Sequence, residues 1–249
     1  MDKMLYIAMN AAKHTELQQA TTSNNLANVH TNGFKAELVA FRALPVVGDG
    51  MPTRAHVVDS TTGHDSTPGP LQQTGNDQDF AINGKGFFAV EGSDGNEAYT
   101  RDGGFIVDET GLMRTRGGRL ILSDGGGPIT APENSRFLIG RDGSISAVSI
   151  DAGQRQPQVI GRLKLVADET GKDFYKGTDG LFRRRDGQQA ELSEAVSVTA
   201  GALEGSNVNP VEALVQMIGH ARQYEMNVKL MQTADQNARQ ATQIMSLNA

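Results

Sequence analysis

Small and apolar residues recur every three or four positions near the beginning of the chain. They are Leu5, Ala8, Ala12, Thr15, Thr22, Leu26 and Val29, with the polar Gln19 at the position between Thr15 and Thr22. This spacing places them on one stripe of an α-helix, which we predict for residues 3 to about 30, with Gly33 as its stop. Because the stripe is rich in Ala and Thr, such a helix is marginal alone and needs a partner.

The end of the chain shows a second helical pattern. Asn209 as cap, Pro210 in the first turn and Glu212 behind them predict a helix start. A three-four spacing then runs to the end of the chain, which is typical of a coiled coil. Its positions are Leu214, Met217, Ala221, Tyr224, Val228, Met231, Asp235, Ala238, Thr242 and Met245. An amphipathic helix packed on its own domain is the alternative. The matching stripe at the other end of the chain favours a pair of terminal helices.

The middle of the chain has a β pattern. Between residues 80 and 204, short apolar runs such as those at 87–90, 105–107 and 137–139 alternate with turn dipeptides. Asp-Gly pairs, among them Asp94-Gly95, Asp102-Gly103 and Asp142-Gly143, favour tight hairpin turns. Turns spaced about ten residues apart predict an antiparallel sheet of short strands. The Gly- and Pro-rich residues 35–79 then form an extended arm. The fold class is α+β, mainly β.

Composition narrows the possible functions. The net charge of −6 argues against nucleic acid as a partner, and the absence of cysteine excludes disulfides and thiolate chemistry. The chain has no run of 18 apolar residues, and its N-terminus lacks the pattern of a cleaved secretory signal. The five histidines form no helical metal pair, and no nucleophile motif is present. We therefore predict no catalytic, cofactor or metal site and no small-molecule substrate.

Three motifs carry a resemblance to a known family. Residues 23–35, SNNLANVHTNGFK, resemble the N-terminal signature of the flagellar rod and hook family, with His30 departing from its usual residue. Residues 80–90 and 99–105 resemble the start of that family's β-domain, and residues 201–208 its C-terminal helix region. Residues 40–46 and 204–210 are more similar to the proximal-rod members than to distal-rod or hook members.

The resemblance implies a structural, non-enzymatic subunit of the rod of the bacterial basal body, which crosses the periplasm and serves motility. It implies export by the flagellar type III apparatus without a cleaved signal, and helical assembly with itself and other rod proteins. The expected organisation is an inner layer of residues 1–34 and 205–249, an arm of 35–79 and an outer β-domain of 80–204. The alternatives are a distal-rod or hook subunit and a secreted β-rich enzyme or binding module. The expected assembly interface comprises Leu5, Ala8, Ala12, Asn24, Asn25, Leu26, Asn28, Val29, Leu214, Met217, Ala221, Tyr224, Val228, Met231, Ala238 and Met245.

Overall fold

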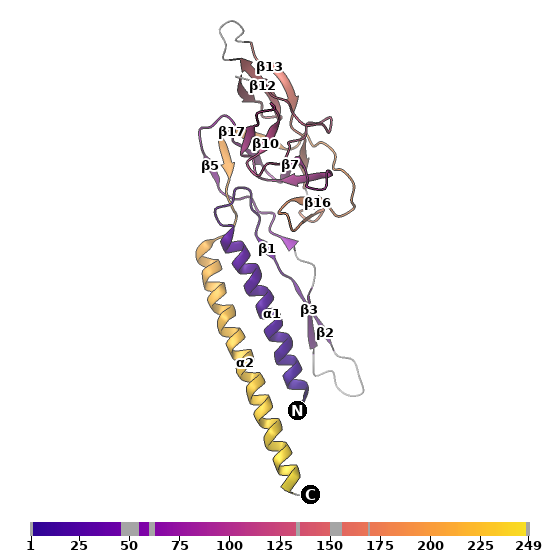
Figure 1. Ribbon diagram of the computed structural model, residues 1–249, viewed down its shortest axis with the longest axis vertical. Coiled ribbons are helices and arrows are strands. Elements are labelled where there is room, and N and C mark those ends of the chain that lie inside the picture. The colour runs from indigo at the N-terminus through magenta and orange to yellow at the C-terminus, as the bar shows by residue number, and fades with distance from the viewer. Residues whose placement is uncertain are drawn as a thin grey trace. The chain divides into compact units, whose positions relative to one another are not determined.

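The chain divides into two compact units (Figure 1). The computed structural model describes residues 2–45, 55–59, 63–132, 135–149, 156–168 and 170–247. A helical unit comprises the described residues of 1–27, 37–63 and 209–249, and a β-unit comprises those of 28–36 and 64–208. Helices at both chain ends and an antiparallel β region between them confirm the predicted α+β fold.

Two antiparallel helices form the helical unit. They are α1 (Asp2–Ala27) and α2 (Pro210–Leu247), which lie side by side with both chain ends at the same end of the pair (Figure 1). Helix α1 buries Ala8, Ala12 and Thr22. Asn227 of α2 donates from Nδ2 to Thr15 Oγ1 at 3.4 Å. Small buried side chains allow two helices to approach closely, which accounts for the weak hydrophobicity of the α1 stripe.

The ends of the helices follow local side-chain chemistry. Asn209 Oδ1 accepts hydrogen bonds from the backbone nitrogens of Val211 at 3.1 Å and Glu212 at 3.3 Å, which confirms the predicted cap of α2. Helix α1 ends at Ala27, three residues earlier than predicted. A turn follows it, in which the nitrogen of Thr31 donates to the carbonyl of Asn28 at 3.1 Å.

A β-hairpin packs on α1 within the predicted arm. Strand β2 (Phe41–Pro45) pairs antiparallel with β3 (Ala55–Asp59), and β1 (Glu37–Leu38) precedes them. The carbonyl oxygen of Val57 lies 2.9 Å from His14 Nε2 and accepts a hydrogen bond from Asn10 Nδ2 at 3.1 Å. The predicted arm therefore contains paired strands, and polar side chains of α1 contact the hairpin through one backbone carbonyl.

The β-unit consists of short antiparallel strands. Five of them form a sheet in the order β14-β7-β8-β16-β15, three form the sheet β11-β12-β13, and β9–β10, β6–β17 and β5–β18 are pairs. The strands from β4 onward are β4 (Gly63–His64), β5 (Leu71–Gln73), β6 (Phe80–Asn83), β7 (Gly86–Glu91), β8 (Glu97–Thr100), β9 (Phe105–Val107), β10 (Met113–Thr115), β11 (Ser135–Ile139), β12 (Ser144–Ser149), β13 (Gln158–Arg162), β14 (Leu165–Ala167), β15 (Phe174–Lys176), β16 (Phe182–Arg184), β17 (Ser197–Ala200) and β18 (Ala202–Glu204).

Strand β7 organises the core because both of its faces are buried. Phe88 and Val90 belong to the larger apolar cluster, whereas Phe87 and Ala89, on the opposite face, belong to a second cluster. Successive side chains of a strand point to opposite faces, so this one strand joins both halves of the core.

The predicted glycine turns fall into two kinds. Gly95 and Gly143 have φ angles of 73° and 82°, in the left-handed region that a tight turn requires. The prediction of a left-handed hairpin turn at Gly103 is wrong. A Cβ atom there would lie 1.7 Å from the carbonyl oxygen of Phe80, so this glycine is required by a close approach of two backbones.

Candidate functional site: helix pair and motif junction

The structure places the expected assembly residues in different environments. Ala8 and Ala12 are buried, whereas Leu26, Met217, Val228, Met231 and Asn25 are half-buried in the helical unit. Asn28 and Val29 are half-buried in the β-unit. The remaining positions whose side chains are described are exposed, namely Leu5, Asn24, Leu214, Ala221, Tyr224 and Ala238. The side chain of Met245 lies outside the described residues.

Helix α2 buries positions one residue earlier than several of those expected. The buried residues are Ala213, Asn227 and Ala234, while the neighbouring Leu214 and Asp235 are exposed. One helical residue corresponds to a rotation of about 100°, so the face of α2 against α1 is lined by smaller residues than the expected stripe. The buried positions of α2 are therefore occupied by small or hydrogen-bonding residues, and the large apolar side chain of Leu214 lies at the surface.

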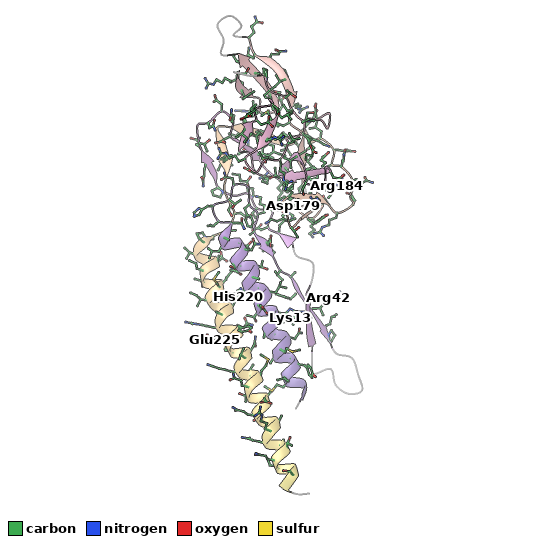
Figure 2. All side chains as sticks on the ribbon, in the orientation of Figure 1. Lys13, Arg42, Asp179, Arg184, His220 and Glu225 are labelled. Atoms are coloured by element: carbon green, nitrogen blue, oxygen red, sulfur yellow. The ribbon has the colours of Figure 1, made fainter. Side chains whose placement is uncertain are left out.

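The larger apolar residues at the start of α2 remain at the surface. Val211, Leu214, Val215 and Ile218 are 68%, 48%, 64% and 56% exposed, and we call these four residues the α2 patch. Their spacing places them on neighbouring positions of the helix surface. In Figure 2, exposed side chains of α2 such as Glu225 project from the side of the helix away from α1. A contiguous group of exposed apolar side chains is typical of an interaction surface.

The three sequence motifs meet inside the β-unit. Lys35 from the first motif, Arg101 from the second and Glu204 from the third form a buried ionic cluster, with exposures of 3%, 3% and 1%. Lys35 Nζ lies 2.6 Å from Glu204 Oε1, and Arg101 Nη2 lies 2.6 Å from Glu204 Oε2. We call this cluster the motif junction.

Backbone contacts complete the motif junction. Lys35 Nζ also donates to the carbonyl of Thr67 at 2.7 Å, and the nitrogen of Gly69 donates to Glu204 Oε1 at 2.9 Å. The nitrogen of Gly33 donates to the carbonyl of Glu204 at 2.7 Å. A Cβ atom on Gly33 would lie 2.4 Å from the carbonyl carbon of Arg101, and its φ angle is 67°. The glycine of the first motif is thus needed for both its conformation and its lack of a side chain.

Burial and charge act in opposite directions on the two cations of the junction. Burial lowers the pKa of Lys35, while the hydrogen bond and the charge of Glu204 raise it. The pKa of Arg101 is likewise lowered by burial and raised by Glu204. The pKa of each cation is lowered on balance because burial outweighs the effect of Glu204, which is the main group that stabilises their charged forms.

Sequence reasoning missed this juxtaposition, although each motif contains one of the three charges. Lys35 and Glu204 are separated by 169 positions, and a motif gives no information about which distant segment it contacts. The available signal was weak: each motif contains a charged residue, and a charge needs a partner if it is buried, but the sequence does not show which of these charges are buried.

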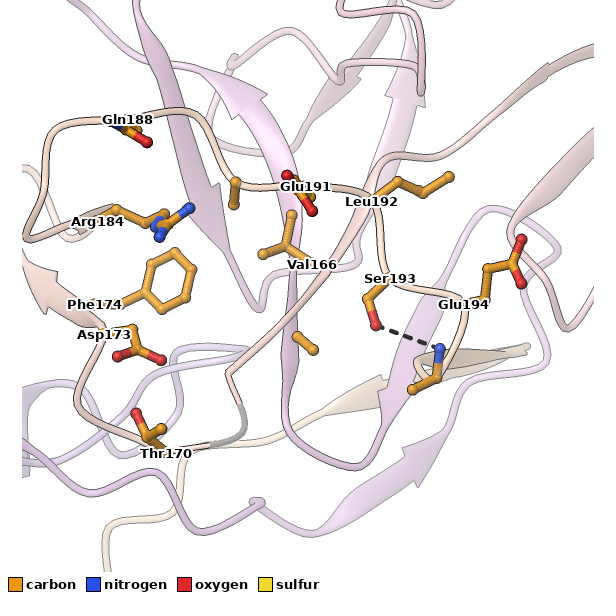
Figure 3. A pocket seen from close by; sticks show the side chains of 13 residues that line it. Val166, Thr170, Asp173, Phe174, Arg184, Gln188, Glu191, Leu192, Ser193 and Glu194 are labelled. Carbon is orange, nitrogen blue, oxygen red and sulfur yellow. Dashed lines mark hydrogen bonds between the residues drawn. The ribbon is translucent and has the colours of Figure 1, made fainter.

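A cavity of about 820 Å³ lies elsewhere in the β-unit (Figure 3). The residues that line it include Asp173, Arg184, Glu191, Ser193 and Glu194. Ser193 Oγ accepts a hydrogen bond from the nitrogen of Ala195 at 3.3 Å, as the dashed line in Figure 3 marks. The described lining contains no histidine, lysine or cysteine, and the hydrogen bond described for Ser193 Oγ joins it to the backbone of Ala195.

Two further kinds of site are absent from the described part of the chain. Its histidine and carboxylate side chains form no group of three or more that could hold a metal ion. Neither α1 nor α2, as far as the structure describes them, is apolar enough over a sufficient length to cross a membrane.

Comparisons with known proteins agree with this geometry. Residues 5–35 match a family model described as flagella basal body rod protein, residues 81–147 the D1 domain of flagellar hook protein FlgE/F/G, and residues 199–244 the C-terminal region of flagellar basal body rod FlgEFG proteins. These segments contain, or border, the three motifs that meet at the junction. The chain belongs to the flagellar basal-body rod protein family.

Individual proteins of this family show which members the chain is similar to. The chain is 42% identical to the flagellar basal-body rod protein FlgF of Salmonella typhimurium and to that of Escherichia coli, with both chains covered completely. It is 34% identical to FlgF of Caulobacter vibrioides over 98% of each chain. A flagellar basal-body rod protein FlgG of Buchnera aphidicola is 34% identical over 96% of this chain and 98% of its own. The predicted family is confirmed, and a structural rod protein is favoured over a hook subunit and over a secreted binding module.

Proposed function

We propose that this chain is a non-enzymatic subunit of the proximal rod that polymerises through its helical unit. The observation that carries the proposal is the α2 patch, which exposes four large apolar side chains on a helix whose opposite face already packs on α1. Subunits related by a screw operation make head-to-tail contacts, which build a helical tube. The patch supplies apolar area for such a contact.

The remaining parts of the proposal rest on membership of the rod protein family. The proposed partners are further copies of this chain and other rod proteins, and the proposal includes no nucleic acid and no small-molecule substrate. We place the subunit in the axial rod that crosses the periplasm, delivered by the flagellar type III apparatus without a cleaved signal. In this arrangement the terminal helices form the inner layer and residues 80–204 the outer layer.

Substitution of one patch residue tests the proposal. Val215→Asp puts a charge into the α2 patch, and we expect loss of swimming when this variant replaces the wild-type gene in its host. Gln216→Asp is the matched control, because it puts the same charge on the adjacent, exposed position of the same helix. Both variants should keep wild-type helical content by circular dichroism, since neither side chain is buried.

The basal bodies distinguish the possible outcomes. Purified basal bodies from the Val215→Asp strain should contain truncated rods without this subunit, whereas those of the Gln216→Asp strain should be complete. Normal swimming and complete rods with Val215→Asp would refute assembly through the patch. Complete rods that lack hooks would indicate the distal-rod or hook alternative.

A further inference from the structure

Three buried polar atoms lie on residues that line one small cavity in the β-unit. Arg101 Nε, His64 Nε2 and Asp168 Oδ2 have no hydrogen-bond partner among the described residues. Buried polar side-chain atoms are nearly always paired in folded proteins, so three such atoms around one cavity require an explanation.

Two of the three side chains, Arg101 and Asp168, cannot turn to find another partner without losing existing hydrogen bonds. Arg101 donates from Nη1 to the carbonyl of Gly86 at 2.8 Å and from Nη2 to that of Gly84 at 2.9 Å. Asp168 Oδ1 accepts from the nitrogen of Gly171 at 2.9 Å. The His64 ring packs edge-on against Phe182, with ring centroids 4.8 Å apart. The unpaired atoms of Arg101 and Asp168 are therefore held in place by the hydrogen bonds of their own side chains, and the packing on Phe182 fixes the position of the His64 ring.

The small volume of the cavity limits which molecule can occupy it. Its volume is about 10 Å³, and a buried water molecule requires about 10–15 Å³ measured in this way, with two to four polar partners. Larger ligands such as phosphate do not fit. We propose that this cavity is a binding site for one structural water molecule, which bridges Arg101 Nε, His64 Nε2 and Asp168 Oδ2.

The chemistry of the three atoms also fits water better than an ion. Arg101 Nε can only donate and a carboxylate oxygen can only accept, whereas water does both. An anion would face the carboxylate of Asp168, and a cation would face Arg101 together with Lys35 and Lys85, which also line the cavity. A neutral molecule avoids both repulsions.

The neutral form of the His64 ring is consistent with a bridging water molecule. Burial lowers the pKa of His64, and the positive charges of Lys176, Lys35 and Arg185 lower it further, against the opposing charge of Asp65. The ring is therefore neutral at neutral pH, and its Nε2 atom donates or accepts according to the tautomer. The bridging water can adapt to either tautomer by rotating.

The bridge would add to bonds that already join these segments: Lys35 Nζ donates to the carbonyl of Thr67 at 2.7 Å, and Ser66 Oγ donates to the carbonyl of Gly171 at 3.5 Å. His64 follows the hairpin β2–β3 along the chain, Asp168 follows β14, and Arg101 belongs to the motif junction. The water thus adds the side chains of His64 and Asp168 to the bonded groups around the junction.

A crystal structure of the full chain at a resolution that reveals ordered water tests the proposal. We expect one water peak within hydrogen-bonding distance of all three atoms. Soaking a second crystal in bromide distinguishes an anion, because bromide gives an anomalous peak. An anomalous peak in the cavity, a cavity without density, or a side chain turned towards another partner would each overturn the proposal.

Nuclear magnetic resonance provides an independent measurement in solution. The Arg101 Nε–H signal should show a cross-peak to water with the sign of a long-lived, bound molecule. Arg114 is the control, because its Nε already donates to Asp108 Oδ2 at 2.6 Å. If Arg101 and Arg114 show the same behaviour towards water, no bound molecule bridges the site.

Discussion

Replacing Glu204 by glutamine removes the negative charge that Lys35 and Arg101 share, with little change in shape. The glutamine can keep an oxygen at the position of Oε1, which accepts from the nitrogen of Gly69. Lys35 retains its bond to the carbonyl of Thr67. The perturbation is therefore mainly electrostatic, because two buried cations lose their counter-charge.

The magnitude follows from burial. All three side chains of the junction are at most 3% exposed, so solvent cannot replace the missing charge. Breaking a buried ion pair by removing one partner costs about 3–5 kcal/mol. The whole stability of a domain is about 5–15 kcal/mol. Glu204→Gln is therefore expected to remove a large fraction of the free energy of unfolding of the β-unit.

Urea unfolding followed by circular dichroism measures this loss. The control is Asp77→Asn, which neutralises the partner of Arg136 in the same unit. Those two side chains are 40% and 66% exposed, and exposed pairs contribute about 0.2–1 kcal/mol. A loss for Glu204→Gln no larger than that for Asp77→Asn would refute the view that the junction depends on its charge.

Three further predictions concern backbone and titration. Gly103→Ala should prevent folding of the β-unit, because its Cβ would meet the carbonyl oxygen of Phe80 at 1.7 Å; Gly127→Ala, which has open space, should fold normally by circular dichroism. Asn209→Ala should lower the free energy of unfolding by about 1 kcal/mol in urea titrations, because two nitrogens of α2 lose their cap. His64 has a lowered pKa in the folded chain, so the unfolded chain binds the proton first as pH falls below about 6.5. Its contribution to stability is therefore lost with acidification, and His64→Gln should reduce the difference in unfolding free energy between pH values of about 7.5 and 5.5.

Features that depend on a few consecutive residues could be predicted from the sequence. The cap at Asn209 and the left-handed glycines of the hairpin turns are properties of a few consecutive residues. The stripe of α1 was also correctly located at Ala8, Ala12 and Thr22, since these small residues face the inside of the pair.

The inner face of α2 shows why the other helix was harder to predict. Hydrophobicity favoured Leu214 and Val228, but Ala213 and Asn227 are the buried residues. A helix that packs closely on an alanine-rich partner selects small side chains, and an asparagine can be buried where it meets a hydroxyl. The size of the partner's side chains is information that a single helix does not contain.

The hairpin β2–β3 and the motif junction depend on contacts between distant segments. His14 and Asn10 hold the hairpin through one carbonyl oxygen, that of Val57. Neither residue has a pattern that marks it as a partner of a strand. These contacts exist only in the folded chain, so the periodicity of the sequence could not predict them.

The meeting of Lys35 and Glu204 also has a consequence for the order of folding. The two residues are separated by 169 positions, and closing a flexible loop of that length costs about 4.5 kcal/mol plus a constant. Hairpins such as β7–β8 close much shorter loops, so they can form first and shorten the effective distance. The junction, like the contact between Thr15 and Asn227, requires segments from near both ends of the chain. We therefore expect a chain that folds from its middle outward and completes both units only when its last segment has arrived.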